Sequence, residues 1–399
     1  MTSRLRLAVG GAGLGLGALL ARNLVKYKRA TSERFELLES PQPGTLEFAH
    51  LVEAMTGAAQ RPGNRVEVMR NGVTLDAMVD AISEAKRTIN FSSYIYWPGP
   101  TADRFSAALA ERAEAGVRVN LLLDGYGSAK LDREHQDRLR RAGVHVATFR
   151  PPRWHSVHKA NNRMHRRILI VDGVVGFAGG VGIADVWTGD AEDPEHWRET
   201  HLRIEGPALR ELYGAFLETW AEATGEVLTN DHIPERSGFD DGVDVVVSRS
   251  TPTGWATATT LIFFAAIAGA RKRLWLTTAY FAPDRAFEDL LCATAKRGVD
   301  IRLLINGQHV DKEVARQAGR RSYTKLLDAG IRIFEYDQTM LHAKVILVDD
   351  EWANVGSGNF DNRSLDLDLE LNVAVADRDC VAELEEHFLE DLAVSQEID

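Results

Sequence analysis

The chain has 399 residues, of which 45% are hydrophobic and 26% charged, an ordinary globular composition with enough apolar material for two or three domains. Its formal net charge of −11 argues against a protein that coats nucleic acid, because phosphates repel an acidic surface. With only two cysteines, it has no disulfide framework and no cysteine-based zinc site.

The N-terminal segment differs from the rest of the chain, because residues 7–21 carry no charge. The cations that flank this run are Arg4, Arg6, Arg22, Lys26, Lys28 and Arg29. A membrane span needs about 20 apolar residues. We therefore expect residues 1–30 to be a membrane anchor or an interfacial segment whose cations face anionic lipid. A cleaved signal peptide and a disordered tail are the alternatives. Residues 31–62, in which residues 40–44 carry two prolines, are expected to be a linker.

From residue 63 the sequence alternates between strand and helix patterns. The predicted strands are residues 66–69, 88–97, 117–124, 144–149, the segment that carries His165, and 198–205. The predicted helices are residues 75–87, 102–115, 133–142 and 207–223. We take residues 63–228 as a first half, which ends at a polar linker at 229–241.

The second half, residues 242–399, repeats this order. Its predicted strands are residues 243–248, 274–281, 299–306, 331–336, the segment that carries His342, and 369–376. Its predicted helices are residues 256–268, 286–295, 312–329 and 381–394. A local echo supports duplication, since Leu-Leu-Leu-Asp-Gly at 121–125 corresponds to Leu-Leu-Ile-Asn-Gly at 303–307. The alternation predicts an α/β sheet in each half.

One polar pattern occurs in both halves. In the second half, His342 and Lys344 precede an apolar run that ends at Asp349, and Gly356-Ser357-Gly358-Asn359 follows. Residues two apart on a strand share a face, so the imidazole and the ammonium are expected to point into the same cleft.

The first half carries the counterpart. His165 and Arg167 precede an apolar run that ends at Asp172, and Gly179-Gly180 follows. The spacing from His to Asp is seven residues in both copies, and so is the spacing from Asp to the first Gly. Two copies with identical spacing argue against two unrelated core histidines and for one active site shared by the halves.

Two histidines and two cations in one cleft are suited to phosphoryl transfer without a metal or cofactor. One neutral imidazole attacks phosphorus, and the other, protonated, gives its proton to the departing alkoxide. The cations hold the non-bridging oxygens as charge builds. Glu199 and Glu370, at the starts of the strands that follow each copy, are placed to accept a hydrogen bond from one ring nitrogen and so fix the tautomer.

These residues resemble the HKD motif, His-x-Lys-x4-Asp, of the phospholipase D superfamily. The second copy matches it fully, including residues 356–359 and the Asn-Arg-Ser at 362–364. The first copy lies in residues 162–167, and its context at 176–180 and 197–201 is similar to the bacterial cardiolipin synthase branch. The resemblance covers the chain from about residue 63 to the C-terminus.

The resemblance implies a duplicated phospholipase D-like fold, whose two halves are mixed-sheet α/β units related by pseudo-two-fold symmetry. It also implies a phosphatidyltransferase that makes cardiolipin from phosphatidylglycerol through a phosphohistidine. His165 is then the nucleophile and His342 the general acid, later the base for the incoming alcohol. The other residues implied as catalytic are Arg167, Lys344, Asp172 and Asp349. Those implied in binding phosphate or in orienting the histidines are Asn359, Ser357, Gly180, Glu199 and Glu370. The aspartates are expected to hold the cleft together through polar contacts.

The implied partners are an anionic phospholipid, above all phosphatidylglycerol, and the surface of the bacterial cell membrane. Neither nucleic acid nor an obligate protein partner is expected. Three alternatives stay open: a phospholipase D that releases phosphatidic acid with water as acceptor, a nuclease of the same superfamily, and an inactive lipid-binding scaffold. Two departures from the motif keep the last alternative open, because Arg167 replaces Lys and Gly182 stands where the second copy has Asn359.

The segment before the first motif is basic in an otherwise acidic protein. Its cations are Arg150, Arg153, Lys159, Arg163, Arg166 and Arg167, and they occur with His155 and His158. We expect either a collar that draws anionic headgroups towards the cleft or a solvated loop. Nearby Trp154, Trp187 and Trp197 are expected at a lipid interface or in the core. The histidine pair lacks further ligands at a suitable spacing for a metal site.

Overall fold

The computed structural model describes residues 40–152, 161–229, 232–234, 237–252 and 256–399. The strands of the first half are β1 (Gln60–Arg70), β2 (Thr88–Ser93), β3 (Arg118–Asp124), β4 (His145–Phe149), β5 (Ile168–Val171), β6 (Val175–Gly179) and β7 (Thr200–Glu205). Its helices are α3 (Val73–Glu84), α4 (Pro100–Glu114), α5 (Arg133–Arg141), the 3-10 helix η1 (Asp185–Trp187) and α7 (Leu209–Thr224).

The strands of the second half are β8 (Val243–Arg249), β9 (Arg273–Thr278), β10 (Phe281–Ala282), β11 (Asp300–Asn306), β12 (Arg332–Tyr336), β13 (Val345–Val348), β14 (Trp352–Gly356), β15 (Phe360–Asp361), β16 (Leu371–Ala376) and β17 (Ser395–Ile398). Its helices are α8 (Ala258–Gly269), α9 (Arg285–Lys296), α10 (Glu313–Arg320), α11 (Tyr323–Asp328), α12 (Asn362–Asp366) and α13 (Arg378–Ala393). Helix α2 (Leu46–Thr56) precedes both halves.

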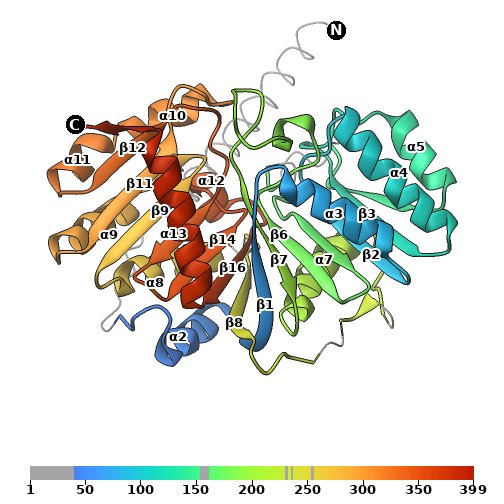
Figure 1. Cartoon of the computed structure of the whole chain (residues 1–399), viewed down its shortest axis with the longest axis horizontal. Helices are drawn as coiled ribbons and strands as arrows, with labels where there is room; N and C mark the ends of the chain where they lie inside the picture. Colours follow the sequence, from blue (N-terminus) through green and yellow to red (C-terminus); the bar gives the residue numbers. More distant parts are fainter. Residues whose placement is uncertain (1–39, 153–160, 230–231, 235–236, 253–255) are drawn as a thin grey trace, which may run out of the picture.

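Fifteen strands form one mixed sheet whose order repeats around its centre. Outward from the centre, the first half runs β1-β7-β6-β5-β2-β3-β4 and the second runs β8-β16-β14-β13-β9-β11-β12, with β17 added at its edge. The halves join where β1 and β8 pair antiparallel, and Figure 1 shows them as two lobes on either side of this pair. The repeated order confirms the predicted duplication.

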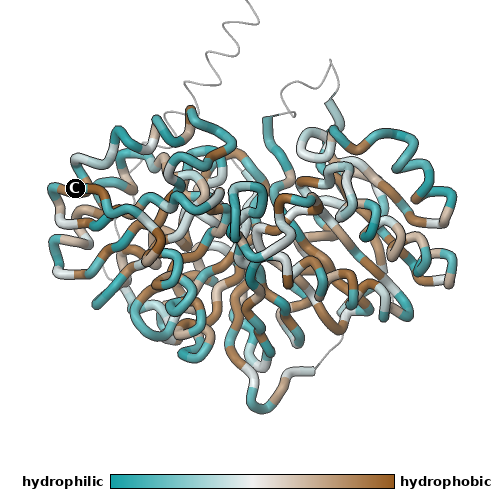
Figure 2. The backbone as a smooth tube through the Cα atoms, turned by 45° about the horizontal axis from the view of Figure 1, so that its top comes forward, coloured by the Kyte–Doolittle hydropathy of each residue, from teal (hydrophilic) through white to brown (hydrophobic). Residues whose placement is uncertain are grey.

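Helices cover both faces of the sheet because the central strands are apolar on both sides. All four residues of β5 are buried, and they alternate between two cores. Ile168 and Ile170 pack in the core that includes α7, while Leu169 and Val171 pack in the core of α3, α4 and α5. Strand β13 is buried in the same way, between α13 and the α8–α9 layer. Figure 2 shows these hydrophobic strands crossing the interior while the outer turns are hydrophilic.

The structure corrects three sequence predictions about the elements. Residues 46–56, expected in a linker, form α2, whose Phe48 packs edge-on against Trp352 at 5.6 Å. Strands β6 and β14 were missed; β6 has two glycines among its five residues, and β14 is a run of five residues that contains Asn354 and ends in glycine. The helix expected at 312–329 is two helices, α10 and α11.

The predicted N-terminal membrane segment, residues 1–30, lies outside the described residues. Among the residues that are described, no helix combines the length and the apolar character needed to cross a bilayer.

Candidate active site

The two motif segments cross between the halves. Met164 forms a parallel bridge with Leu369 of the second half, and Leu341 forms one with Arg198 of the first. The backbone N–H of His165 donates to the carbonyl of Leu369 at 2.9 Å. The backbone N–H of His342 donates to the carbonyl of Arg198 at 2.7 Å. Each histidine therefore lies beside a segment of the other half: His165 lies beside the segment that leads to Glu370, and His342 beside the one that leads to Glu199.

Two polar side chains that the sequence analysis did not single out hold these crossing segments in place. Asp124, at the end of β3, accepts a hydrogen bond from the backbone N–H of Met164 at 3.0 Å. Asn306, at the end of β11, accepts one from the backbone N–H of Leu341 at 2.7 Å. Both are buried. They are the Asp and the Asn of the echo at 121–125 and 303–307, which was the signal that could have identified them.

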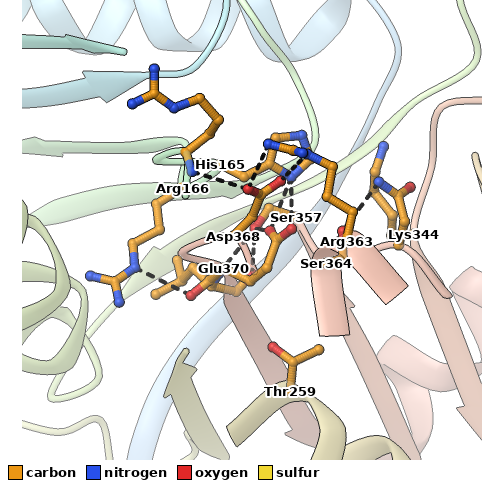
Figure 3. Close-up of polar contacts among 12 residues, drawn as sticks. His165, Arg166, Thr259, Lys344, Ser357, Arg363, Ser364, Asp368 and Glu370 are labelled. Carbon is orange, nitrogen blue, oxygen red and sulfur yellow. Dashed lines mark hydrogen bonds and ion pairs between the residues drawn. The ribbon is translucent and has the colours of Figure 1, made fainter. Parts of the chain in front are cut away.

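His165 is held by a carboxylate from the other half. Its Nδ1 lies 2.9 and 3.0 Å from the two carboxylate oxygens of Glu370, and Ser357 donates its hydroxyl to the same carboxylate (Figure 3). Burial raises the pKa of Glu370 to about 7, with Ser357 acting against that rise. With Nδ1–H donating to Glu370, the lone pair of the imidazole is on Nε2.

His342 has the mirrored arrangement, with Glu199 of the first half bound to its Nδ1. The backbone N–H of Thr200 also donates to Glu199, at 2.9 Å. Gly180 stands where the second half has Ser357, and a Cβ at Gly180 would collide with the Glu199 carboxylate. The first half therefore needs glycine at position 180 for close packing, whereas the second half uses a hydroxyl donor at the equivalent place.

A buried cation accompanies each histidine. Arg167 donates to the carbonyl of His165 at 2.7 Å and contacts its Nε2 at 3.1 Å. Lys344 donates to the carbonyl of His342 and lies 2.9 Å from its Nδ1. Burial, together with these two cations, lowers the pKa of both histidines well below the usual range. Both imidazoles are therefore neutral in the free protein.

The two cations differ in how they tolerate burial. Burial lowers the pKa of Lys344 to about 7, against the opposing effect of Glu199. Burial also lowers the pKa of Arg167, but an arginine begins so high that its charge persists at every physiological pH. The Nε of Arg167 is buried without a hydrogen-bond partner among the described residues, which leaves it available to a ligand.

This difference predicts the pH dependence of substrate binding. Lys344 is charged below its pKa of about 7 and neutral above it, so it should give kcat/KM for a phosphodiester an alkaline limb above pH 7. Glu370, whose pKa is also about 7, must be ionised to balance a positive charge on His165, so it should give the acid limb. Lys344→Arg keeps the charge and should move this alkaline limb up by more than about one pH unit. The matched change Arg167→Lys should make the alkaline loss steeper. An unmoved limb in Lys344→Arg, read from pH profiles of kcat/KM, would show that Lys344 does not set it.

The two motif copies differ at the position where the second copy has Asn359 and the first has Gly182. Asn359 is buried, its Nδ2 makes only a 3.5 Å bond to Ser364, and its Oδ1 has no partner among the described residues. A Cβ at Gly182 would lie 2.8 Å from the ring of Trp187. The indole of Trp187 therefore occupies the space that an asparagine at 182 would need, and its ring centroid is 5.5 Å from that of His342.

A family model described as "Cardiolipin synthase, PLD-like domain" matches residues 78–218 and 263–392, one stretch in each half. The chain belongs to this family. The two matched stretches contain both histidines, both cations and both orienting glutamates.

Curated relatives and solved structures agree with this membership. The chain is 36% identical over 329 residues to cardiolipin synthase 2 of Bacillus anthracis, covering 82% of this chain and 64% of that protein. It is 34% identical over 389 residues to a cardiolipin synthase of Geobacillus thermodenitrificans, covering 93% and 77%. The chain thus spans less than two thirds of the length of the Bacillus anthracis protein.

A crystal structure of phosphatidylserine synthase from Haemophilus influenzae has a similar fold, with a TM-score of 0.65 at 12% identity over 88% of this chain and 92% of that one.

The family's two motif aspartates lie away from the histidines, which corrects the expectation that they hold the cleft together. Asp172 follows β5 at the end opposite His165, and its carboxylate accepts from the backbone N–H groups of residues 86–88 at 2.7–2.8 Å. Asp349 does the same after β13 for residues 271–273. Both have a left-handed backbone, with φ of 53°. Their contacts fix the turn that leads into β2 and into β9.

Replacing Asp349 by alanine is expected to lower the free energy of unfolding by about 3 kcal/mol, because three backbone donors lose a charged acceptor. Asp349→Asn keeps one acceptor oxygen and tolerates the positive φ, so it should recover part of the loss. Urea unfolding monitored by circular dichroism measures both variants. Equal stability of Asp349→Ala and the wild type would contradict this structural role.

The basic collar is largely a buried network. Arg166 is fully buried and donates to the backbone carbonyl of Glu370 (Figure 3). It also donates to the backbone carbonyls of Ala215 and Ser250 and to the side chain of Glu218. It therefore ties the two halves together beside the site instead of meeting lipid.

Other members of the predicted collar are also engaged or lie elsewhere. Arg163 is buried, with its guanidinium 3.7 Å from Asp124. Arg150 pairs with Glu222 at 2.7 Å. Arg167 lies in the site beside His165. The other members, Arg153, His155, His158 and Lys159, fall with Trp154 in residues 153–160, outside the described residues. Of the other tryptophans, Trp187 is core and Trp197 packs 5.5 Å from His342.

Proposed function

We propose that this protein is a phosphatidyltransferase that makes cardiolipin from two molecules of phosphatidylglycerol. One observation carries the proposal: each of two neutral imidazoles is held at Nδ1 by a carboxylate from the other half, with a buried cation beside it. This arrangement supplies a nucleophile, a proton donor and an anion site in one place.

In the first step His165 is the nucleophile, as the family resemblance assigns. Its Nε2 lone pair lies beside the guanidinium of Arg167, where a phosphodiester oxygen would be held. Nε2 forms a bond to the phosphorus of phosphatidylglycerol, and the bond between phosphorus and the glycerol headgroup breaks. Glu370 stabilises the positive charge that develops on the ring.

His342 supplies the proton that the glycerol alkoxide takes up as it leaves. In the free protein the charges of Lys344 and Arg167 add to burial in keeping this imidazole neutral. A bound phosphodiester offsets those charges, so substrate binding raises the pKa of His342 and favours the protonated acid. Glu199 keeps the proton on Nδ1 and leaves Nε2 to exchange protons with substrate.

In the second step the reaction runs in reverse with a new alcohol. The hydroxyl of a second phosphatidylglycerol gives its proton to Nε2 of His342 and attacks the phosphorus. The bond between phosphorus and Nε2 of His165 breaks, which releases cardiolipin and the free imidazole. If water attacks instead, the product is phosphatidic acid, so the hydrolase is the second candidate and it uses the same residues.

The names of the curated relatives favour the transferase over the hydrolase, because these relatives are cardiolipin synthases. The reaction would take place at a membrane surface, since both substrates are lipids. In residues 1–30, an uncharged run is flanked by cations. We propose that this segment attaches the protein to the membrane surface.

Incubation of the purified protein with phosphatidylglycerol vesicles, followed by lipid analysis, tests the proposal. Cardiolipin and an equal amount of free glycerol are expected. Phosphatidic acid without cardiolipin would establish the hydrolase. Cleavage of DNA with untouched lipid would establish the nuclease, and unchanged lipid and DNA would establish the inactive scaffold.

A further inference from the structure

Outside the paired motifs, each half has a lysine at an equivalent position. Lys130 is six residues after Asp124, and Lys312 is six residues after Asn306. Those two residues hold the crossing segments that carry the histidines. Each lysine therefore belongs to the loop that follows a strand end at the active site.

Each of these lysines lies over an aromatic ring. The Nζ of Lys130 is 3.6 Å from the centroid of Trp97, and the Nζ of Lys312 is 4.6 Å from the centroid of Tyr280. Neither ammonium forms an ion pair with a carboxylate within the described part of the chain. An ammonium held over a ring keeps its charge and its donors free for an anion.

Lys312 belongs to the side of the site that holds His342. Tyr280 beneath it is buried and clusters with Met340, two residues before His342, and with Trp197. The ring of Trp197 is in turn 5.5 Å from the imidazole of His342. After burial and the motif cations, the charge of Lys312 is among those that lower the pKa of both histidines.

The acidic neighbours of Lys312 are engaged elsewhere. Asp311 accepts a hydrogen bond from the hydroxyl of Tyr280. Burial and this carboxylate raise the pKa of Tyr280, so the phenol keeps its proton and remains a hydrogen-bond donor. Glu313 bonds to Arg316 at 3.2 Å. Asp361 also feels the charge of Lys312, but its carboxylate accepts from the backbone N–H of Ser364 at 2.8 Å. The exposed side chain of Lys312 is thus a cation at the edge of the site that forms no ion pair with a carboxylate of the described residues.

Lys130 lies in the corresponding loop of the first half, over Trp97. Its loop packs on Tyr94, since Ser128 donates its hydroxyl to the Tyr94 carbonyl at 2.9 Å. The ring of Tyr94 meets the imidazole of His165 edge-on at 4.8 Å. Lys130 is therefore a matched counterpart of Lys312 that differs in which histidine it accompanies.

We propose that Lys312 binds the phosphate of the acceptor phospholipid and so determines which alcohol receives the phosphatidyl group. The inference rests on the proposed function. The acceptor hydroxyl must reach His342, and in phosphatidylglycerol that hydroxyl is one glycerol unit from a negatively charged phosphate. A cation beside His342 attracts this acceptor, whereas water and neutral alcohols carry no charge for it to bind.

The test is a competition between two acceptors in one vesicle assay. Phosphatidylglycerol vesicles are supplied with ethanol, and the ratio of cardiolipin to phosphatidylethanol is measured for the wild type, Lys312→Gln, Lys312→Arg and Lys130→Gln. Lys312→Gln should lower this ratio about tenfold, the effect of losing one charge-assisted contact. Lys312→Arg should restore most of it, and Lys130→Gln should leave the ratio at the wild-type value.

The outcomes separate the two proposals. Wild-type protein that forms phosphatidylethanol but no cardiolipin would refute the proposed function before any variant is compared. With cardiolipin formed by the wild type, an unchanged ratio in Lys312→Gln would overturn the acceptor site. An equal fall in Lys312→Gln and Lys130→Gln would also overturn it, because it would indicate attraction of lipid to the surface as a whole.

Discussion

Replacing His165 by alanine is expected to lower kcat/KM for phosphatidyl transfer by about 10⁵-fold, because the chemical step loses its nucleophile. The imidazole is buried and fixed by Glu370, so no neighbouring group has the position to take over its bond to phosphorus. Rates of cardiolipin formation from phosphatidylglycerol measure the loss. His145→Ala is the control, since His145 is outside the site, 3.7 Å from Glu226, and its loss should leave the rate unchanged.

A substrate with an activated leaving group separates the roles of the two histidines. A nitrophenyl phosphodiester needs no proton on its leaving group, so His342→Ala should release nitrophenol in the first turnover at a rate close to that of the wild type and then stall, because the second step still needs His342 as the base. His165→Ala should not cleave it. The reverse pattern would show that the two assignments must be exchanged.

Replacing Glu370 by alanine is expected to lower kcat/KM by about 10³- to 10⁴-fold, as is typical when the carboxylate that orients a catalytic imidazole is lost. The crossing of the halves makes the prediction specific. Although Glu370 follows His342 in sequence, it contacts His165, so Glu370→Ala should fail on the activated substrate as His165→Ala does. Glu199→Ala should instead behave like His342→Ala and retain the first-turnover release of nitrophenol.

A double-mutant cycle tests the same pairing without reference to mechanism. The combination of His165→Ala with Glu370→Ala should be little worse than His165→Ala alone, because both changes disable one unit. Glu370→Gln serves as the isosteric comparison, since it keeps the size of the side chain but not its charge. Additive effects for His165 with Glu370, together with coupling of His165 to Glu199, would contradict the crossed arrangement.

The duplicated fold was predictable from sequence because several of its central strands are uninterrupted apolar runs in a repeated order, and that order is seen again in the symmetric sheet. The pairing of each histidine with the other half's glutamate could not be predicted. It depends on the bridges of Met164 with Leu369 and of Leu341 with Arg198, which no local pattern encodes.

The surroundings of Arg166 and Gly182 in the folded protein also could not be predicted from residue type. From the sequence, Arg166 is expected to be one more exposed cation of a basic loop. In the structure its guanidinium is buried and donates hydrogen bonds to three backbone carbonyls and to Glu218. Gly182 reads as a lost phosphate ligand, but the structure shows Trp187 in the space that a side chain would need. In both cases the partner is fixed by tertiary packing and is distant from any sequence motif.

The central claim is that a phosphatidyl group passes through His165 in a site built by both halves. Its most direct test uses phosphatidylglycerol with a radiolabelled phosphate, quenched in base, in which a phosphohistidine bond is stable, and then mapped by peptide analysis. We predict the label on the peptide that contains His165. Label on the peptide that contains His342, or turnover without any covalently labelled protein, would contradict the account.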